Sequence, residues 1–278
     1  MSGTGPGGRG KGHLGRGLVV GAAATWTAGR ALRSAPPGGA GRWTRTNHRG
    51  ETVTLLAGPA AAAGGTVAAL VVPGLAPSTR IAAALAVAGA GALGTYDDLS
   101  GSGDRRGLRG HLGGLAHGEL TTGAVKVLGI GASGLLAGVL LRRRPLDALL
   151  AGGVVAGTAN LVNLLDLRPG RAAKAVLLLA VGPALRGGPG ATLAGVAAGA
   201  AAISLPEDLG EVTMLGDAGA NALGALVGAA MSAGSTRRGL VLRLAALVAA
   251  TLASERVSFT QVIEATPGLR ELDRLGRR

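Results

Sequence analysis

Residues 122–141 read TGAVKVLGIGASGLLAGVLL, an apolar stretch that contains a single charged side chain, Lys126. A helix needs roughly 17 to 25 predominantly apolar residues to cross a bilayer. A helix of this length in a soluble protein would carry a polar face to meet water, and such a face is almost absent here. The stretch therefore predicts a membrane-spanning helix and decides the class of fold.

Similar apolar stretches recur along the chain on both sides of residues 122–141. Hydrophobic residues make up 47% of the 278 positions and charged residues only 15%, which is not the composition of an ordinary soluble domain. The sequence predicts an all-α, polytopic membrane helix bundle of about nine transmembrane helices. The predicted spans are residues 17–32, 53–72, 79–96, 122–141, 146–162, 172–185, 190–205, 218–234 and 240–253.

Charge and cysteine content narrow the function classes. The chain has no cysteine, so it has neither disulfides nor thiolate metal sites. Its formal net charge of +13 suits contact with anionic lipid headgroups and phosphorylated substrates. No part of the sequence resembles a nucleic-acid-binding module. A membrane and a phosphorylated ligand are therefore the expected partners.

The two ends of the chain differ from the apolar middle. Residues 1–15 are predicted to be a flexible basic tail, and residues 16–254 to form the membrane domain. The basic residues ahead of a short apolar run also fit the start of a secretory signal peptide, and this alternative stays open. Residues 255–278 are predicted to be a cytoplasmic amphipathic segment, in which Ser258 and Gln261 can form a capping box.

Nearly all acidic residues fall on one side of the predicted membrane domain. With nine spans, fourteen of the fifteen Asp and Glu residues lie on the side that holds residues 97–121, and only Asp147 lies opposite. The distribution of Lys and Arg mildly favours this acid-rich side as cytoplasmic. Polar chemistry is therefore expected at one face. Five of its acids are predicted to be solvated loop residues, namely Glu207, Asp208, Glu211, Glu271 and Asp273.

Three clusters on this face lie where a predicted span meets the aqueous phase. Mg²⁺ requires hard oxygen ligands, and Asn amides and helix N-terminal N–H groups suit a diphosphate or a uracil edge. A single Asp at a span end is also explained by a helix cap. Three clusters together predict a functional site, because each buried charge costs about 2.5 to 3.5 kcal/mol at a helix centre. They comprise Asp97 with Asp98, Asn160 with Asn163 and Asp166, and Asp217.

The motifs YDD (96–98), NLVNLLD (160–166) and MLGDAGANALG (214–224) resemble, in order and sidedness, those of a known family. This family is the polyprenyl-phosphate N-acetylhexosamine-1-phosphate transferases, which include the phospho-MurNAc-pentapeptide translocase of peptidoglycan synthesis. The resemblance runs from about residue 45 to residue 228. It implies a multi-pass protein of the bacterial plasma membrane with a cytoplasmic active face. It also implies transfer of a sugar-1-phosphate from a UDP-N-acetylhexosamine to undecaprenyl phosphate, with release of UMP, in cell-envelope synthesis.

The resemblance also implies roles for individual residues. Asp97 and Asp98 would lie at the reaction centre as catalytic residues, one of them taking a proton from the lipid phosphate. Asp217, together with Asp98, would bind the Mg²⁺ cofactor. The expected cofactor is therefore Mg²⁺, held by these two carboxylates.

A second set of residues is implied to bind substrate. Asn160, Asn163 and Asp166 would hold the nucleotide or its diphosphate. Lys126 would meet a phosphate, and the alternative is an interfacial lysine that snorkels to the membrane surface. A homodimer is compatible with the sequence, which does not fix the oligomeric state.

The sequence departs from the family pattern at three places. After the Asp pair, LSG (99–101) replaces the family's Lys or equivalent. Pro169 stands where the family has the second Asp of its Asn-rich motif, and the family's His-rich loop near the C-terminus has no counterpart. The alternative function is therefore a catalytically inactive member that binds the lipid carrier or an envelope-assembly partner. A transporter would carry polar residues midway through several spans, and few are found. His48, His111 and His117 fall on the acid-rich face, where solvated histidines are common.

Overall fold

The structure is a computed structural model that describes residues 6–47, 49–100 and 122–278. These residues form helices almost throughout, with one short hairpin. The elements in chain order are α1 (Pro6–Ser34), η1 (Ala40–Trp43), β1 (Thr44–Thr46), β2 (Thr52–Thr54), α2 (Ala57–Val71), α3 (Pro77–Ser100), α5 (Thr122–Leu141), α6 (Pro145–Leu165), α7 (Arg171–Arg186), α8 (Gly188–Leu209), α9 (Gly216–Ser232), α10 (Arg237–Ser254), α11 (Phe259–Ala265) and α12 (Leu269–Arg274).

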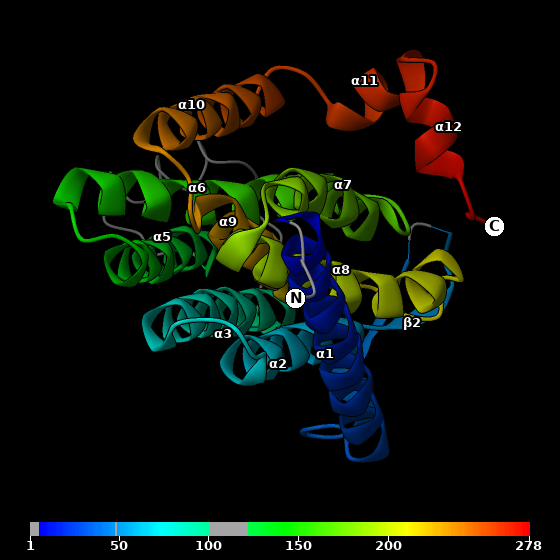
Figure 1. The fold of residues 1–278 in the computed structure, drawn as a ribbon. Coiled ribbons are helices and arrows are strands. Elements are labelled where there is room, and N and C mark those ends of the chain that lie inside the picture. Colours follow the sequence, from blue (N-terminus) through cyan, green and yellow to red (C-terminus); the bar gives the residue numbers. More distant parts are fainter. Residues whose placement is uncertain (1–5, 48, 101–121) are drawn as a thin grey trace.

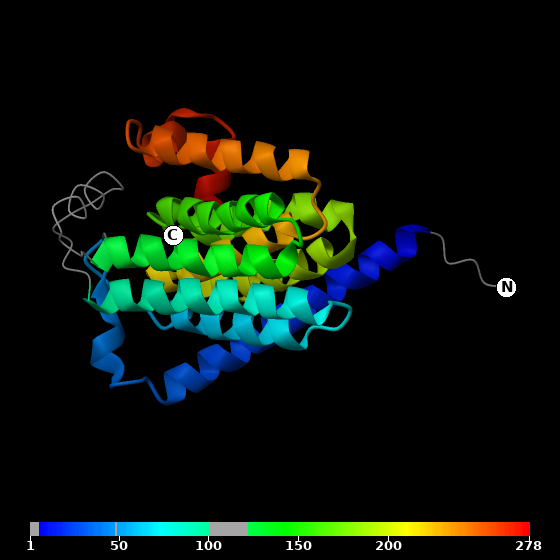
Figure 2. The ribbon, with the colours of Figure 1, turned by 90° about the vertical axis from the view of Figure 1, so that its left-hand side faces the viewer.

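The long helices form a bundle around α9. Figure 2 shows α2, α3, α5 and α6 running side by side, while α1 crosses the bundle obliquely. Helix α9 packs against α2, α3, α6, α7 and α8, and nearly all of its residues are buried. Its sequence, GDAGANALGALVGAAMS, has no polar face that could meet water. The uniform small and apolar composition of α9 therefore makes it the central helix.

Glycines let two neighbouring helices approach the N-terminal end of α9 closely. A Cβ atom at Gly94 on α3 would overlap the backbone carbonyl of Asp217, and one at Gly58 on α2 would overlap the carbonyl of Leu215. Small residues permit such close backbone contact between membrane helices. These contacts fix the first turn of α9 against α2 and α3, and so position Asp217.

The predicted all-α class is confirmed, but the prediction of nine spans is not. Each predicted span overlaps one helix of the part of the chain that the structure describes. Among the described residues, three helical segments are long and apolar enough to cross a membrane: Gly123–Leu141, Pro145–Leu165 and Gly188–Leu209. Helix α1 begins at Pro6 and so extends into the segment predicted to be a tail.

A hairpin connects two distant loops at one end of the bundle. Strands β1 and β2 pair antiparallel, with Arg45 opposite Val53. Thr54 also forms a bridge to Thr213, in the segment that precedes α9, and the N–H of Met214 donates to the carbonyl of Thr54 at 2.9 Å. The hairpin therefore ties the α1–α2 connection to the start of α9.

The last three helices lie on the outside of the bundle. Helix α10 packs against α6, and α11 and α12 lie over α7 at the edge of the molecule (Figure 1). Only Leu240 and Leu247 of α10 are buried. Ser258 occupies the N-cap of α11, but its side chain makes no capping hydrogen bond, so the predicted capping box is not formed. This outer layer leaves apolar side chains at the surface.

Candidate functional site

The carboxylate of Asp98 caps the N-terminus of α9. Its Oδ1 accepts the N–H of Asp217 at 3.0 Å, and its Oδ2 accepts the N–H of Ala218 at 2.9 Å. The first N–H groups of a helix have no partner within the helix, and the helix dipole favours a negative charge there. Asp98 lies at the end of α3, so a residue of one helix satisfies the first turn of another. This pairing fixes the position of Asp217 relative to the Asp pair.

Lys126 connects Asp97 with Asp217. Its Nζ donates to Oδ2 of Asp97 at 2.7 Å and also to Oδ2 of Asp217. All three side chains are largely buried, with 17% of Lys126, 17% of Asp97 and 26% of Asp217 exposed. Helices α3, α5 and α9 each contribute one of the three groups. The two carboxylates therefore lie close enough to share one cation.

Asp166 lies within electrostatic reach of this cluster. It follows the last residue of α6 and accepts a hydrogen bond from the backbone of Gly216. Burial and the negative charges of Asp208, Asp217 and Asp98 raise the pKa of Asp166 well above its usual range. The structure thus brings acidic side chains from α3, α6, α8 and α9 to one end of the bundle.

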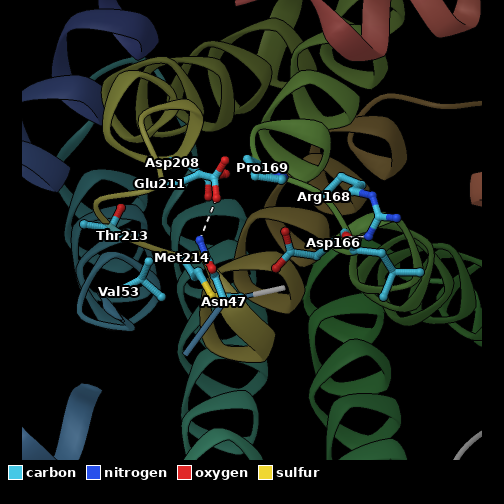
Figure 3. Close-up of a pocket in the computed structure, with 10 residues that line it drawn as sticks. Asn47, Val53, Asp166, Arg168, Pro169, Asp208, Glu211, Thr213 and Met214 are labelled. Carbon is cyan, nitrogen blue, oxygen red and sulfur yellow. Dashed lines mark hydrogen bonds between the residues drawn. The ribbon is translucent and has the colours of Figure 1, made fainter. Parts of the chain in front are cut away.

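Asp166 also lines a cavity of about 220 Å³ beside this cluster. Figure 3 shows Asp166 on one side of the cavity, opposite Asn47, Glu211 and Thr213. The cavity walls come from the α1–α2 connection, the α6–α7 loop and the α8–α9 segment. The remaining lining residues are Val53, Leu167, Arg168, Pro169, Asp208 and Met214.

Three acids that the sequence predicted to be solvated loop residues are buried. Asp208, Glu211 and Asp273 are 4%, 7% and 7% exposed, so the prediction was wrong for them. Glu207 and Glu271 are partly exposed and form ion pairs with arginines, as solvated acids commonly do. The sequence carries no signal for this difference, because the fold alone turns Asp208 and Glu211 toward the cavity.

Glu211 and Thr213 give the cavity its polar wall. Glu211 adopts a φ of 55°, which is uncommon for a residue other than glycine. Its carboxylate accepts the amide of Asn47 at 2.6 Å and the guanidinium of Arg49 at 3.1 Å. Thr213 is buried, and its hydroxyl has no hydrogen-bond partner among the described residues. A bound ligand would supply the partner that this hydroxyl lacks.

The two remaining predicted site residues, Asn160 and Asn163, make other contacts. The amide of Asn160 donates to the hydroxyl of Thr251 on α10 at 3.1 Å, so Asn160 joins two helices. Asn163 is half-buried on α6, and its backbone carbonyl accepts the N–H of Asp166. His48, His111 and His117 lie outside the described residues.

The donor set fits a divalent cation only in part. Within residues 6–47, 49–100 and 122–278, no group of three His, Asp or Glu side chains is arranged to hold a metal ion. Mg²⁺ in proteins commonly takes one or two carboxylates, with substrate phosphates and water completing its shell. Asp97 and Asp217 share one ammonium group and so form such a pair. The ammonium group of Lys126 already bridges the two carboxylates, so the pair alone meets this requirement only in part.

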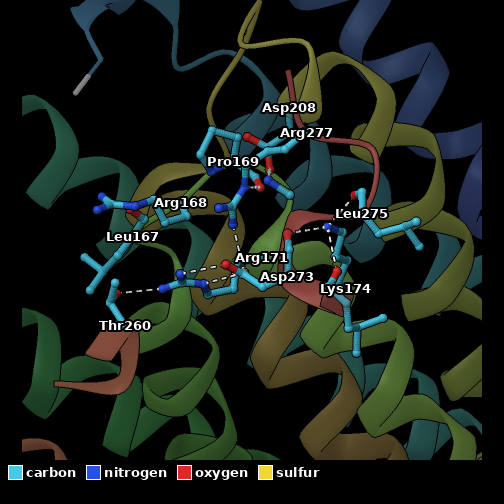
Figure 4. A network of polar contacts seen from close by, with 12 residues as sticks. Leu167, Arg168, Pro169, Arg171, Lys174, Asp208, Thr260, Asp273, Leu275 and Arg277 are labelled. Atoms are coloured by element: carbon cyan, nitrogen blue, oxygen red, sulfur yellow. Dashed lines mark hydrogen bonds and ion pairs between the residues drawn. The ribbon is translucent and has the colours of Figure 1, made fainter. Parts of the chain in front are cut away.

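A buried ion network attaches the C-terminal segment to the loop that lines the cavity. The Nε and Nη2 of Arg171 donate to the two carboxylate oxygens of Asp273 at 2.8 and 3.0 Å. Arg277 pairs with the same carboxylate at 2.8 Å and donates to the carbonyl of Pro169 at 3.2 Å. Lys174 donates to three carbonyls of the segment (Figure 4). The C-terminal segment is therefore held to α7 through Asp273 and to the α6–α7 loop through Arg277.

Comparison with known proteins adds no family assignment, since no family model, curated protein or solved structure matches the chain.

Proposed function

We propose that the chain is a membrane phosphoglycosyl transferase that moves a sugar-1-phosphate from a UDP-N-acetylhexosamine to a polyprenyl phosphate. The meeting of Asp97, Lys126 and Asp217 beside Asp166 carries the proposal. Three of these residues belong to the motifs that resemble the transferase family. The proposal places the carboxylate end of the bundle at the cytoplasmic face of the bacterial plasma membrane.

In the proposed reaction, a phosphate oxygen of the lipid attacks the β-phosphorus of the UDP-sugar. A new P–O bond forms, and the bond from the β-phosphorus to the bridging oxygen breaks. UMP leaves with that electron pair, and the polyprenyl-diphospho-sugar remains. In this proposal Asp97 would take the last proton of the lipid phosphate, and Lys126, its ion-pair partner, would neutralise phosphate charge as it develops.

A divalent cation held by Asp217, with substrate phosphate and water completing its shell, would neutralise the charge of the diphosphate. We assign Asp98 to a different task, because both of its oxygens accept N–H groups of α9. Asp98 holds the first turn of α9, and with it Asp217, at the required position. Its proposed role is therefore to position the site, and we do not assign it as a metal ligand.

We assign the nucleoside part of the donor to the cavity beside Asp166. Ribose hydroxyls and base N–H groups donate hydrogen bonds, and the carboxylates of Asp166 and Glu211 accept them. The unpartnered hydroxyl of Thr213 adds a further polar contact. Asn160 has no part in this assignment, because it is bonded to Thr251.

The test is UMP release by the purified full chain with undecaprenyl phosphate, Mg²⁺ and a panel of UDP-N-acetylhexosamines. Asp97→Asn and Asp217→Asn are each expected to lower turnover at least about 100-fold, as loss of a positioned proton acceptor or charge-stabilising group does. Glu207→Gln is the matched control, because Glu207 is an acid on the same face with 45% of its side chain exposed. No turnover with any sugar, or full turnover in Asp217→Asn, contradicts the proposal.

A second candidate function is a catalytically inactive protein that binds the lipid carrier. Two observations favour it: Lys126 already bridges Asp97 and Asp217, and Pro169 stands at the second Asp position of the motif. Such a protein would bind polyprenyl phosphate with equal affinity with and without Mg²⁺, and it would release no UMP.

A further inference from the structure

Two arginines share one hydroxyl group at the end of the bundle opposite the carboxylates. Arg186 is the last residue of α7, and its Nη1 donates to Oγ of Ser235 at 2.6 Å. Arg243 of α10 donates to the same oxygen at 3.1 Å. Arg186 also donates to the carbonyl of Met231 at 3.3 Å, in the last turn of α9. Two positive side chains from different helices are therefore held together by a neutral group.

A third guanidinium lies at the same helix end. Arg142 directly follows α5 and donates from Nη2 to the carbonyl of Ser232, the last residue of α9. Its Nε is buried and has no hydrogen-bond partner in the described part of the chain. At this end of the described bundle the one acidic residue is Asp147, which forms an ion pair with Arg237 and whose charge also acts on Arg142.

The protein itself supplies too little negative charge to balance this cluster. The C-terminus of a helix carries a partial charge of about half an electron, whereas the three guanidiniums carry one full positive charge each. Partial burial, followed by the positive charges of Arg243 and Arg142, lowers the pKa of Arg186. Like charges are not expected to gather in this way without an anion that offsets their repulsion.

Exposed apolar side chains adjoin two of these arginines in the chain. Leu185 and Leu242 directly precede Arg186 and Arg243 in the chain, and they are 83% and 71% exposed. Val181 on α7 and Val241 on α10 are also exposed, at 50% and 46%. A ligand of this surface would combine an anionic head with hydrocarbon chains, because both kinds of partner lie side by side.

We propose that Arg142, Arg186 and Arg243 form a binding site for the phosphate group of an anionic phospholipid, in the leaflet opposite the carboxylate site. Guanidinium groups bind phosphate oxygens through paired, charge-assisted hydrogen bonds. The exposed leucines accommodate the beginning of the acyl chains. This site requires that the bundle lies in a membrane, and it does not depend on the transferase activity.

The experiment measures lipid binding to the purified full chain in detergent micelles by native mass spectrometry. The probes are phosphatidylglycerol, phosphatidylcholine and inorganic phosphate. The double variant Arg186→Gln/Arg243→Gln is expected to bind phosphatidylglycerol at least about tenfold more weakly than the unchanged chain, because two charge-assisted contacts are lost. Phosphatidylcholine and inorganic phosphate are expected to bind the unchanged chain more weakly than phosphatidylglycerol.

The matched control is the double variant Arg143→Gln/Arg238→Gln. Arg143 and Arg238 lie at the same end and are exposed, and no side-chain hydrogen bond or ion pair is formed by either within the described residues. An equal loss of affinity in this control would mean that general surface charge attracts the lipid, and it would overturn the proposal. If phosphatidylcholine bound as tightly as phosphatidylglycerol, the proposed selectivity for anionic lipids would be wrong. If inorganic phosphate bound as tightly, the ligand would be free phosphate and the proposed lipid site would be wrong.

A second variant keeps the test decisive if the glutamine pair does not fold. Arg186→Lys/Arg243→Lys retains both charges but loses the planar pairs of N–H donors. Its affinity for phosphatidylglycerol is expected to fall severalfold without being lost. An affinity equal to that of the unchanged chain in a folded variant of either kind would overturn the site. The melting temperature without added lipid reports the folding of each variant.

Discussion

Asp273→Asn is expected to release the C-terminal segment from the bundle. The carboxylate of Asp273 accepts hydrogen bonds from Nε and Nη2 of Arg171, and it also pairs with Arg277. The side chains of Arg171 and Asp273 are 5% and 7% exposed. Removing one partner of a buried ion pair costs about 3 to 5 kcal/mol, because the other charge stays buried without compensation. An asparagine still accepts one hydrogen bond, so the lower end of this range applies.

A loss of about 3 kcal/mol lowers the ratio of docked to undocked segment by a factor of roughly 100. Hydrogen exchange of the backbone amides of residues 259–278 measures this ratio in detergent micelles. Amides of α12 are expected to lose most of their protection in Asp273→Asn, and the α6–α7 loop to exchange faster as its contact between Arg277 and Pro169 is lost.

The control for this experiment is Glu264→Gln, which removes the same charge from an exposed position on α11. It is expected to leave the exchange of α12 unchanged. Arg171→Lys keeps the positive charge but loses the bidentate geometry. Its protection of α12 from hydrogen exchange should lie between the values for Asp273→Asn and Glu264→Gln. Unchanged protection of α12 in Asp273→Asn would refute the view that the ion network holds the segment.

Three further predictions concern the site and its pH dependence. Gly94→Ala is expected to destabilise the bundle by about 1 to 3 kcal/mol, measured as a lower melting temperature, because the added methyl meets the carbonyl of Asp217; Gly131→Ala, where the methyl meets nothing within 4 Å, should not. Lys126→Met is expected to reduce UMP release at least about 100-fold, and activity equal to that of the unchanged chain would contradict its role. Burial alone would raise the pKa of Asp273, but its arginine partners more than offset this and lower it. The stabilisation from a lowered carboxylate pKa is present above the ordinary range of Asp and is lost as the pH falls through the lowered value. Docking of the C-terminal segment should therefore persist to below about pH 4 and fail in stronger acid, and release near neutral pH, followed by hydrogen exchange, would contradict it.

The helices and the end of the bundle that holds the acids follow from the sequence. Long apolar stretches such as residues 122–141 have one stable backbone conformation away from water, the helix. Successive spans of a polytopic bundle alternate in direction, so Asp97, Asp166 and Asp217 come to the same end once the helices are counted. This part of the site could be predicted because it depends on chain order and helix length alone.

The lateral arrangement of the helices could not be predicted, since α9 is almost uniformly apolar and small. A helix without a polar face does not encode in its own sequence which neighbours surround it. Only the tertiary structure decides that Asp98 caps α9 and that Lys126 pairs with both Asp97 and Asp217.

The same limit explains the acids whose burial the sequence did not indicate. Asp208, Glu211 and Asp273 lie in short polar segments that fit a solvated loop equally well. Each is buried because a partner from a distant segment reaches it: the N–H of Gly170 for Asp208, Asn47 for Glu211, and an arginine for Asp273. The sequence thus determined the helices and the end of the bundle that holds most of the acidic residues. The partners of each charge were decided by tertiary packing, because a buried carboxylate is stable only where another element brings it a donor.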